Sequence, residues 1–98
     1  MKKLVDFISE SEKKTIRPET WSKCKENYPD RIKLFLVGDS WQSYNEDAVK
    51  VSNILNIDTL KLPEGEFNEI VSFGVKDLNG NLMKLVRAGE QVVTIMED

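Results

Sequence analysis

The sequence predicts a small α/β domain in which helices pack on a mixed sheet. Its 98 residues suffice for one domain, and 40% hydrophobic with 32% charged residues is typical of a globular chain. Segments with helical spacing of apolar residues alternate with short runs of strand-forming residues, which favours the α/β class. We expect about four strands and three helices in one domain over residues 18–98. A polar lead-in at residues 1–17, either a short helix or a flexible segment, precedes it.

Two prolines bound the first predicted helix. Pro18 suits the first helical position, and Pro29 ends the helix because the residue before a proline avoids helical geometry. Trp21, Cys24 and Tyr28 share one helical face. We therefore expect Trp21 and Cys24 in the core. A reactive Cys24 is the less favoured alternative, since nothing in the sequence would lower the pKa of its thiol.

A central strand and a second helix follow. The run from Ile32 to Val37 is almost continuously apolar, as in a strand covered on both faces. Gly38-Asp39-Ser40 ends this strand. The next helix is predicted to begin at Ser43, because Ser43 and Glu46 have the spacing of a capping box. It should end near Asn56.

Three more strands are predicted, at residues 57–62, 70–75 and 91–96. The segment 77–89 between the last two fits two patterns. Asn79-Gly80 is a strong hairpin signal, whereas the apolar residues around it keep helical spacing. The pattern favours a helix here and leaves a hairpin as the alternative.

Composition excludes several kinds of chemistry. Without histidine no Ser-His or Cys-His pair can form, and a single cysteine excludes an intrachain disulfide and a thiolate zinc cluster. No glycines have Walker spacing, and no apolar run approaches the ~18 residues of a membrane span. Asp39, Glu46 and Asp47 could offer oxygens to a cation, but a turn and helix capping explain them. We therefore predict a non-enzymatic cytoplasmic chain with no cofactor, metal, nucleotide or membrane partner.

The net charge of −3 is unevenly spread. Residues 1–33 hold nine Lys/Arg and six Asp/Glu, whereas residues 34–98 hold five and eleven. High-affinity DNA binders usually have a basic balance, so only weak phosphate contact is expected. An ordinary solvated surface is the alternative interpretation of the basic residues. The candidate phosphate contacts are Lys2, Lys3, Lys13, Lys14 and Arg17, with Lys23 and Lys25 beside them.

Several short motifs occur in one order along residues 21–98. They are Tyr28-Pro29-Asp30, Leu34–Val37, Gly38-Asp39, Glu46-Asp47-Ala48, Phe73-Gly74, Leu82–Gly89 and Val92–Glu97. No single motif is specific, but the ordered set resembles the N-terminal domain of MutS-type DNA mismatch repair proteins. The resemblance implies the α/β mismatch-recognition fold of that family. It also implies that Asn79-Gly80 belongs to a helix.

In that family a Phe-x-Glu motif directly after Gly-Asp reads the mismatch. The aromatic ring wedges beside the mismatched base, and the carboxylate hydrogen-bonds to it. The matching positions here are Ser40, Trp41 and Gln42. Serine cannot stack on a base and glutamine presents a neutral amide, so the resemblance implies that mismatch reading is absent at its defining position. The next aromatic residue of the family matches Tyr44, which we expect in the core.

The resemblance leaves two functions open. The leading hypothesis is a DNA-associated accessory domain that binds DNA weakly or joins a larger protein, because the family's ATPase, clamp and lever domains are missing. The rival is a protein–protein interaction module that keeps the fold without DNA binding. Trp41 can be interpreted as a core residue, a protein anchor or a base-stacking platform. An exposed Trp41 with a basic rim would favour nucleic acid, and a large apolar patch would favour protein.

Overall fold

The computed structural model describes residues 15–62 and 65–97, so most of the predicted lead-in lies outside the described residues. The elements are α2 (Pro18–Asn27), β1 (Ile32–Val37), β2 (Ser40–Tyr44), α3 (Asn45–Leu55), β3 (Leu60–Lys61), β4 (Glu69–Gly74), the 3-10 turn η1 (Val75–Asp77), α4 (Leu78–Arg87) and β5 (Val92–Met96). The α/β class is confirmed.

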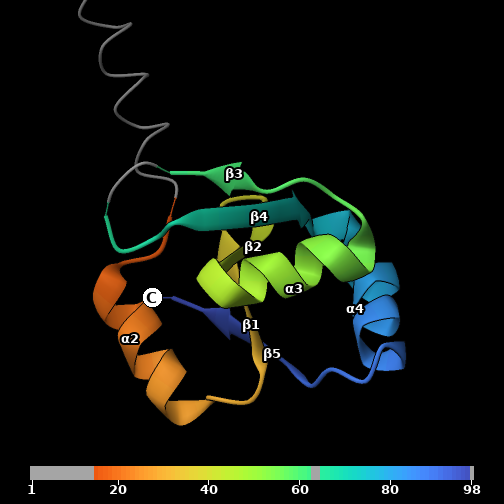
Figure 1. Ribbon diagram of the computed structural model, residues 1–98, viewed down its shortest axis with the longest axis horizontal. Helices are drawn as coiled ribbons and strands as arrows, with labels where there is room; N and C mark the ends of the chain where they lie inside the picture. The colour runs from red at the N-terminus through yellow and green to blue at the C-terminus, as the bar shows by residue number, and fades with distance from the viewer. Residues whose placement is uncertain (1–14, 63–64, 98) are drawn as a thin grey trace, which may run out of the picture.

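The sheet has five strands, in the order β3-β4-β2-β1-β5, rather than about four. Strand β5 runs parallel to β1, and the other neighbours are antiparallel. In Figure 1, α3 crosses in front of the sheet, while α2 and α4 lie at opposite ends. Helices α3 and α4 pack on one face of the sheet, and α2 packs on the other.

Strand β1 is central because it contributes to both cores. Its successive side chains point to opposite faces, so Ile32 and Leu34 pack under α3 and α4 while Phe35 packs under α2. The first core holds Ile32, Leu34, Trp41, Ala48, Val51, Leu55, Val71 and Leu85. The second holds Ile16, Trp21, Cys24, Phe35, Tyr44, Phe67 and Ile70. The core positions predicted for Trp21 and Cys24 are confirmed, and burial raises the pKa of the Cys24 thiol.

Strand β2 is the element that the sequence prediction missed. Gly38 and Asp39 form a two-residue turn, after which the chain returns along β1 with Ser40 opposite Val37. Gly38 has a φ of 61°, which suits the first central position of a type II′ hairpin turn. The predicted break after β1 is therefore a hairpin turn inside the sheet.

The capping box predicted at Ser43 and Glu46 is wrong. Helix α3 begins at Asn45 and has no side-chain cap, because Ser43 still belongs to β2. Strand β2 is hydrogen-bonded to β1 on one side and to β4 on the other, and this pairing overrides the local capping signal. The helix ends as predicted, since Asn56 is its C-cap and has a left-handed φ of 60°.

The C-terminal half agrees more closely with the sequence. Helix α4 runs through Asn79-Gly80, which confirms the helix and excludes the hairpin. Strands β4 and β5 form within a residue of their predicted bounds. The strand predicted at residues 57–62 is only two residues long, because it pairs with β4 at Leu60 and Lys61 alone.

A buried ion pair joins β1 to α3. Lys33 Nζ lies 3.0 Å from Asp47 Oδ2, and the two side chains are 4% and 11% exposed. The Lys33 ammonium also donates to the carbonyl oxygens of Tyr28 and Arg31, at 3.1 and 2.7 Å. The backbone N–H of Lys33 donates to the same Asp47 oxygen at 3.1 Å. The ammonium thus has a partner for each of its three donors.

Asp47→Asn should destabilise the fold. It keeps an oxygen for the Lys33 backbone N–H but leaves a buried ammonium without a counter-charge, which costs about 3 kcal/mol or more of unfolding free energy. Urea unfolding followed by tryptophan fluorescence measures the effect. The control is Glu90→Gln at the surface pair with Lys50, 3.9 Å apart, which should cost less than about 1 kcal/mol. Similar losses in the two variants would contradict a structural role for Asp47.

Ser43→Ala should leave stability unchanged or raise it by up to about 1 kcal/mol. The Ser43 hydroxyl is fully buried and has no hydrogen-bond partner among the described residues, so its removal relieves a desolvation cost. Ser52→Ala is the matched control, because Ser52 Oγ donates to the Ile57 carbonyl and its loss should cost about 1 kcal/mol. A clear loss of stability in Ser43→Ala would show that the hydroxyl is satisfied.

Candidate nucleic-acid interface

Ser40, Trp41 and Gln42, the positions expected to match the Phe-x-Glu motif, begin β2 directly after the hairpin turn. Ser40 lies opposite Val37 of β1 on one side and Gly74 of β4 on the other. The carbonyl of Asp39 accepts a hydrogen bond from the Val75 N–H at 3.1 Å, which ties the turn to η1. The candidate site is therefore held at one end of the sheet by strands on both sides.

Trp41 points into the first core. It lies in register between Leu36 and Phe73 and is 7% exposed. This burial matches the interpretation of Trp41 as a core residue. Its ring is not presented to solvent in this structure, either for stacking on a base or for anchoring a partner.

Ser40 and Gln42 lie on the opposite face, where both are half-buried. The Tyr44 hydroxyl donates to Gln42 Oε1 and accepts from the Ile16 N–H at 3.2 Å. Tyr44 is fully buried, which confirms the core position expected for it. The Gln42 amide is thus hydrogen-bonded to a residue of the second core. Ser40 lies closer than Gln42 to the hairpin turn.

Arg17 lies at the same end of the sheet as Ser40. Because β5 is parallel to β1 with Met96 opposite Leu36, Glu97 comes beside the hairpin end. Arg17 Nε lies 3.0 Å from Glu97 Oε2, and the Thr20 hydroxyl donates to the same oxygen. The Thr20 hydrogen bond, with help from Arg17, holds the pKa of the Glu97 carboxyl below its usual range. The other predicted phosphate contacts, Lys2, Lys3, Lys13 and Lys14, lie outside the described residues.

Sequence reasoning missed two further lysines near the hairpin. Lys76 and Lys84 line a shallow depression of about 450 Å³ together with Asn81. Its remaining lining residues are Leu55, Ile57, Ser72, Phe73, Asp77 and Gly80. Only the pairing of β2 with β4 brings this depression close to the candidate site, and no local pattern reveals that pairing.

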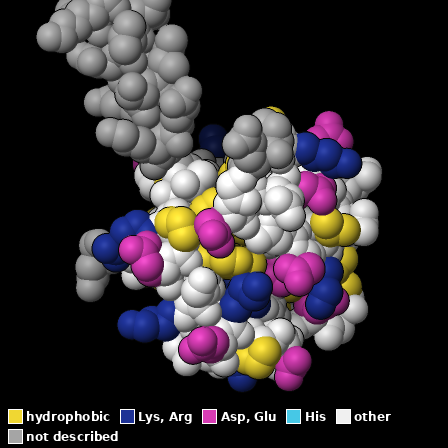
Figure 2. All heavy atoms as spheres, turned by 60° about the vertical axis from the view of Figure 1, so that its left-hand side comes forward, with side chains coloured by type: hydrophobic (Ala, Val, Ile, Leu, Met, Phe, Trp, Pro, Cys, Tyr) yellow, Lys and Arg dark blue, Asp and Glu magenta, His cyan; other side chains and the backbone are white. Residues whose placement is uncertain are grey.

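The charge around the hairpin is mixed. Lys76 is followed by Asp77, and Asp39 occupies the turn itself. On the face shown in Figure 2, Lys/Arg and Asp/Glu side chains are interspersed, and no continuous basic area forms. Among the described residues at the hairpin, charges of both signs occur and Trp41 is buried, so they do not form the basic rim with an exposed tryptophan that would favour nucleic acid.

Metal ligation and membrane spanning each require particular features in the described part of the chain. Its Cys, Asp and Glu side chains form no group of three or more that could hold an ion. Asp47, one of the three carboxylates considered for a cation, is bonded to Lys33. Within residues 15–62 and 65–97, no helix is long and apolar enough to cross a membrane.

Deprotonation of Tyr44 should lower the free energy of unfolding at alkaline pH. Burial raises the pKa of Tyr44 from 10.0 to about 12, so the folded state keeps the phenol proton after the unfolded chain has lost it. This contribution is fully present below pH 10 and is lost as the pH rises through about 12. Urea unfolding between these limits should show a steeper loss for the wild type than for Tyr44→Phe. Equal slopes would contradict this role of Tyr44.

Comparison with known proteins agrees with this architecture. Residues 18–98 match the family model for MutS domain I. The DNA mismatch repair protein MutS of Christiangramia forsetii is 42% identical over 83 residues, which are 84% of this chain and 10% of the relative. The MutS proteins of Porphyromonas gingivalis and Flavobacterium johnsoniae are 41% and 37% identical, covering 69% and 82% of this chain and 8% and 9% of their own lengths. The chain spans about a tenth of these relatives and belongs to the MutS domain I family.

Proposed function

We propose that the chain is a non-enzymatic, DNA-associated accessory domain that contacts duplex DNA weakly and does not read mismatches. Two points support the proposal. The chain belongs to the MutS domain I family, and its resemblance to that family matches Ser40, Trp41 and Gln42, at the start of β2, with the Phe-x-Glu motif. Family membership supports a contact with DNA at the hairpin end. The residue types at these positions argue against insertion of a wedge.

The orientation of β2 side chains supports the loss of mismatch reading. Residues 40 and 42 share one face of the sheet, and residue 41 points to the other. Ser40 is too small to stack on a base, and Trp41 would have to leave the core to do so. The hairpin end thus has no ring to insert between bases, and the bound duplex stays unkinked.

Basic side chains near the hairpin support a weak contact with phosphates. Arg17, Lys76 and Lys84 are the candidates among the described residues, and Asp39 and Asp77 lie among them. The mixed charge limits the number of phosphates that the domain can neutralise. Its affinity should therefore be low and should fall with added salt.

A protein-interaction module is the second candidate. Helix α4 presents Met83 and Val86 to solvent, 53% and 59% exposed, and they line a shallow apolar depression with Leu82 and Arg87. The relatives are about ten times longer than the matched segment, so in them this domain has many more neighbours. A protein that carries the other segments of these relatives would be a partner of this kind.

Restoring the family motif tests the proposal. Anisotropy of labelled duplexes, with and without one mismatch, should give equal micromolar affinities for the wild type at low salt. Ser40→Phe/Gln42→Glu should favour the mismatched duplex by about tenfold, or 1.4 kcal/mol, because it returns both the wedge and the acid to the hairpin. The carboxylate introduced at position 42 can still accept a hydrogen bond from the Tyr44 hydroxyl, as the Gln42 amide oxygen does.

Ser72→Phe/Gln42→Glu is the matched control. Ser72 is exposed and lies opposite Gln42, so the Phe introduced there adds a ring away from the turn. It should show no mismatch preference. Lys76→Gln should weaken binding to both duplexes, whereas Lys61→Gln on β3 should not. A wild-type preference for the mismatch would overturn the proposal. Absence of binding to any duplex would leave the protein-interaction module.

A further inference from the structure

The two edges of the sheet differ in how they are protected. Edge strand β3 is two residues long and carries Lys61, and both features hinder pairing with another chain. Edge strand β5 is five residues long, with the sequence Val-Val-Thr-Ile-Met, and has no charge, proline or glycine. Within the described residues it pairs with β1 alone. Strand β5 is thus the edge that can accept another strand.

The outward backbone groups of β5 can be identified from one hydrogen bond. The Ile32 N–H donates to the Gln91 carbonyl at 2.8 Å, so residue 91 and every second residue after it face β1. Val92, Thr94 and Met96 therefore direct their N–H and C=O groups away from the sheet. Thr94 is exposed, and the Met96 side chain is 71% exposed.

We propose that β5 is a self-association edge at which two copies of this chain pair antiparallel around Thr94. The resulting dimer has two-fold symmetry and one continuous sheet through both copies. The sequence of the strand is self-complementary in this register. Val92 faces Met96 of the second copy on one side of the sheet, Val93 faces Ile95 on the other, and the two Thr94 residues meet at the centre.

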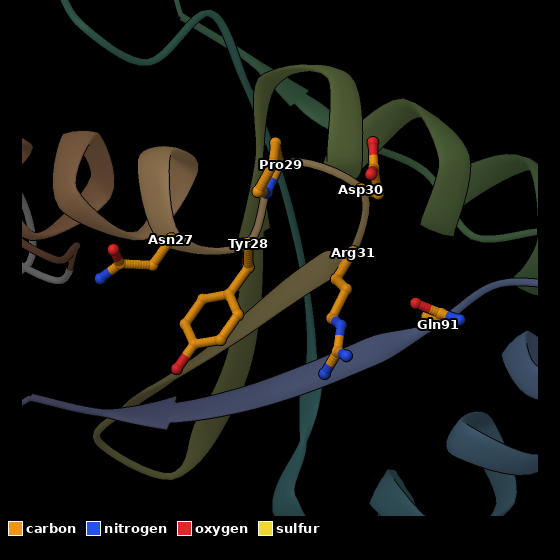
Figure 3. Close-up of a pocket in the computed structure, with 6 residues that line it drawn as sticks. All are labelled: Asn27, Tyr28, Pro29, Asp30, Arg31 and Gln91. Atoms are coloured by element: carbon orange, nitrogen blue, oxygen red, sulfur yellow. The ribbon is translucent and has the colours of Figure 1, made fainter.

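Charge complementarity selects this antiparallel arrangement. Arg31 extends from the start of β1 over the start of β5, where Tyr28 and Gln91 lie beside it (Figure 3). Its side chain is exposed and forms no ion pair within the described chain. Antiparallel pairing places Glu97 of the second copy opposite Gln91, within reach of Arg31. The Glu97 carboxylate already accepts hydrogen bonds from Arg17 and Thr20 through Oε2, so Arg31 would share this carboxylate with them. Parallel pairing of the two edges would instead bring the Glu97 carboxylates together.

The exposed face of α4 is the rival surface for a second copy. Met83 and Val86 offer apolar area there, but all α4 backbone groups between the helix ends are already bonded within the helix. Strand β5 offers apolar side chains and open hydrogen-bonding groups together. Self-association at β5 does not depend on contact with DNA.

Sedimentation velocity over a range of concentrations tests the proposal. The wild type should shift from monomer to a species of twice the mass as the concentration rises. Thr94→Pro should weaken this dimer at least tenfold, because it removes an outward N–H and leaves the β1 ladder intact. Thr94→Lys should do the same by placing a charge on the edge. Met83→Lys, which adds the same charge to α4, should dimerise like the wild type.

Cysteine cross-linking checks the register. Directly opposed residues in a hydrogen-bonded antiparallel pair have Cα atoms about 5.5 Å apart, a distance that a disulfide can span. Thr94→Cys should form a covalent dimer on mild oxidation, and Met83→Cys should not; the native Cys24 is buried. Circular dichroism confirms that each variant is folded. A monomer at all concentrations, or a dimer lost in Met83→Lys but kept in Thr94→Lys, would overturn the proposal.

Discussion

The Asp47 carboxylate completes the central strand at the point where β2 separates from β1. Strand β2 pairs with β1 from Ser40 to Gln42, stays paired with β4 as far as Tyr44, and then turns into α3 through Asn45, which has a φ of 56°. The departure would leave the Lys33 N–H without a strand partner. Asp47 accepts this N–H from the first turn of α3 and also neutralises the buried Lys33 ammonium. The position of α3 on the sheet thus depends on a side chain that completes a backbone ladder.

The same ammonium also fixes the chain between α2 and β1. It donates to the carbonyls of Tyr28 and Arg31 in this connection, and it lies 5.6 Å from the centre of the Trp21 ring. Trp21 in turn meets Phe35 and Tyr44 edge-on. A single buried charge therefore links the helices on both faces to the central strand. Its removal would leave the Asp47 carboxylate buried without a counter-charge, so the pair is more than a local contact.

Local patterns predicted the elements whose cause is local. A continuous apolar run indicated β1, helical spacing indicated α4, and Asn56 marked the end of α3. Elements that depend on distant partners were not predictable in this way. Ser43 has the local chemistry of a helix cap, yet pairing with β4 keeps it in a strand. A lysine such as Lys33 is usually exposed to solvent. Here it is buried because Asp47 and the carbonyls of Tyr28 and Arg31 bind its ammonium group. The motif indicated where the candidate site lies in the sequence. The exposure of its side chains depends on how β2 pairs with β1 and β4, which are separate segments of the chain.

The pairing register of β2 places alternate side chains on opposite faces of the sheet. Trp41 packs in the core, whereas Ser40 and Gln42 lie on the face that can reach a ligand. Because β2 is paired on both sides, position 41 packs against α3 and α4 whatever lies on the other face. The side chains at positions 40 and 42 lie on the opposite face, near the end of the sheet where Arg17 and Glu97 also lie. Under the proposed function, residue changes at positions 40 and 42 would remove the chemistry of mismatch reading without disturbing the core to which Trp41 belongs. The fold itself sets no requirement for a ring or an acid at these two positions, because neither belongs to the buried core clusters.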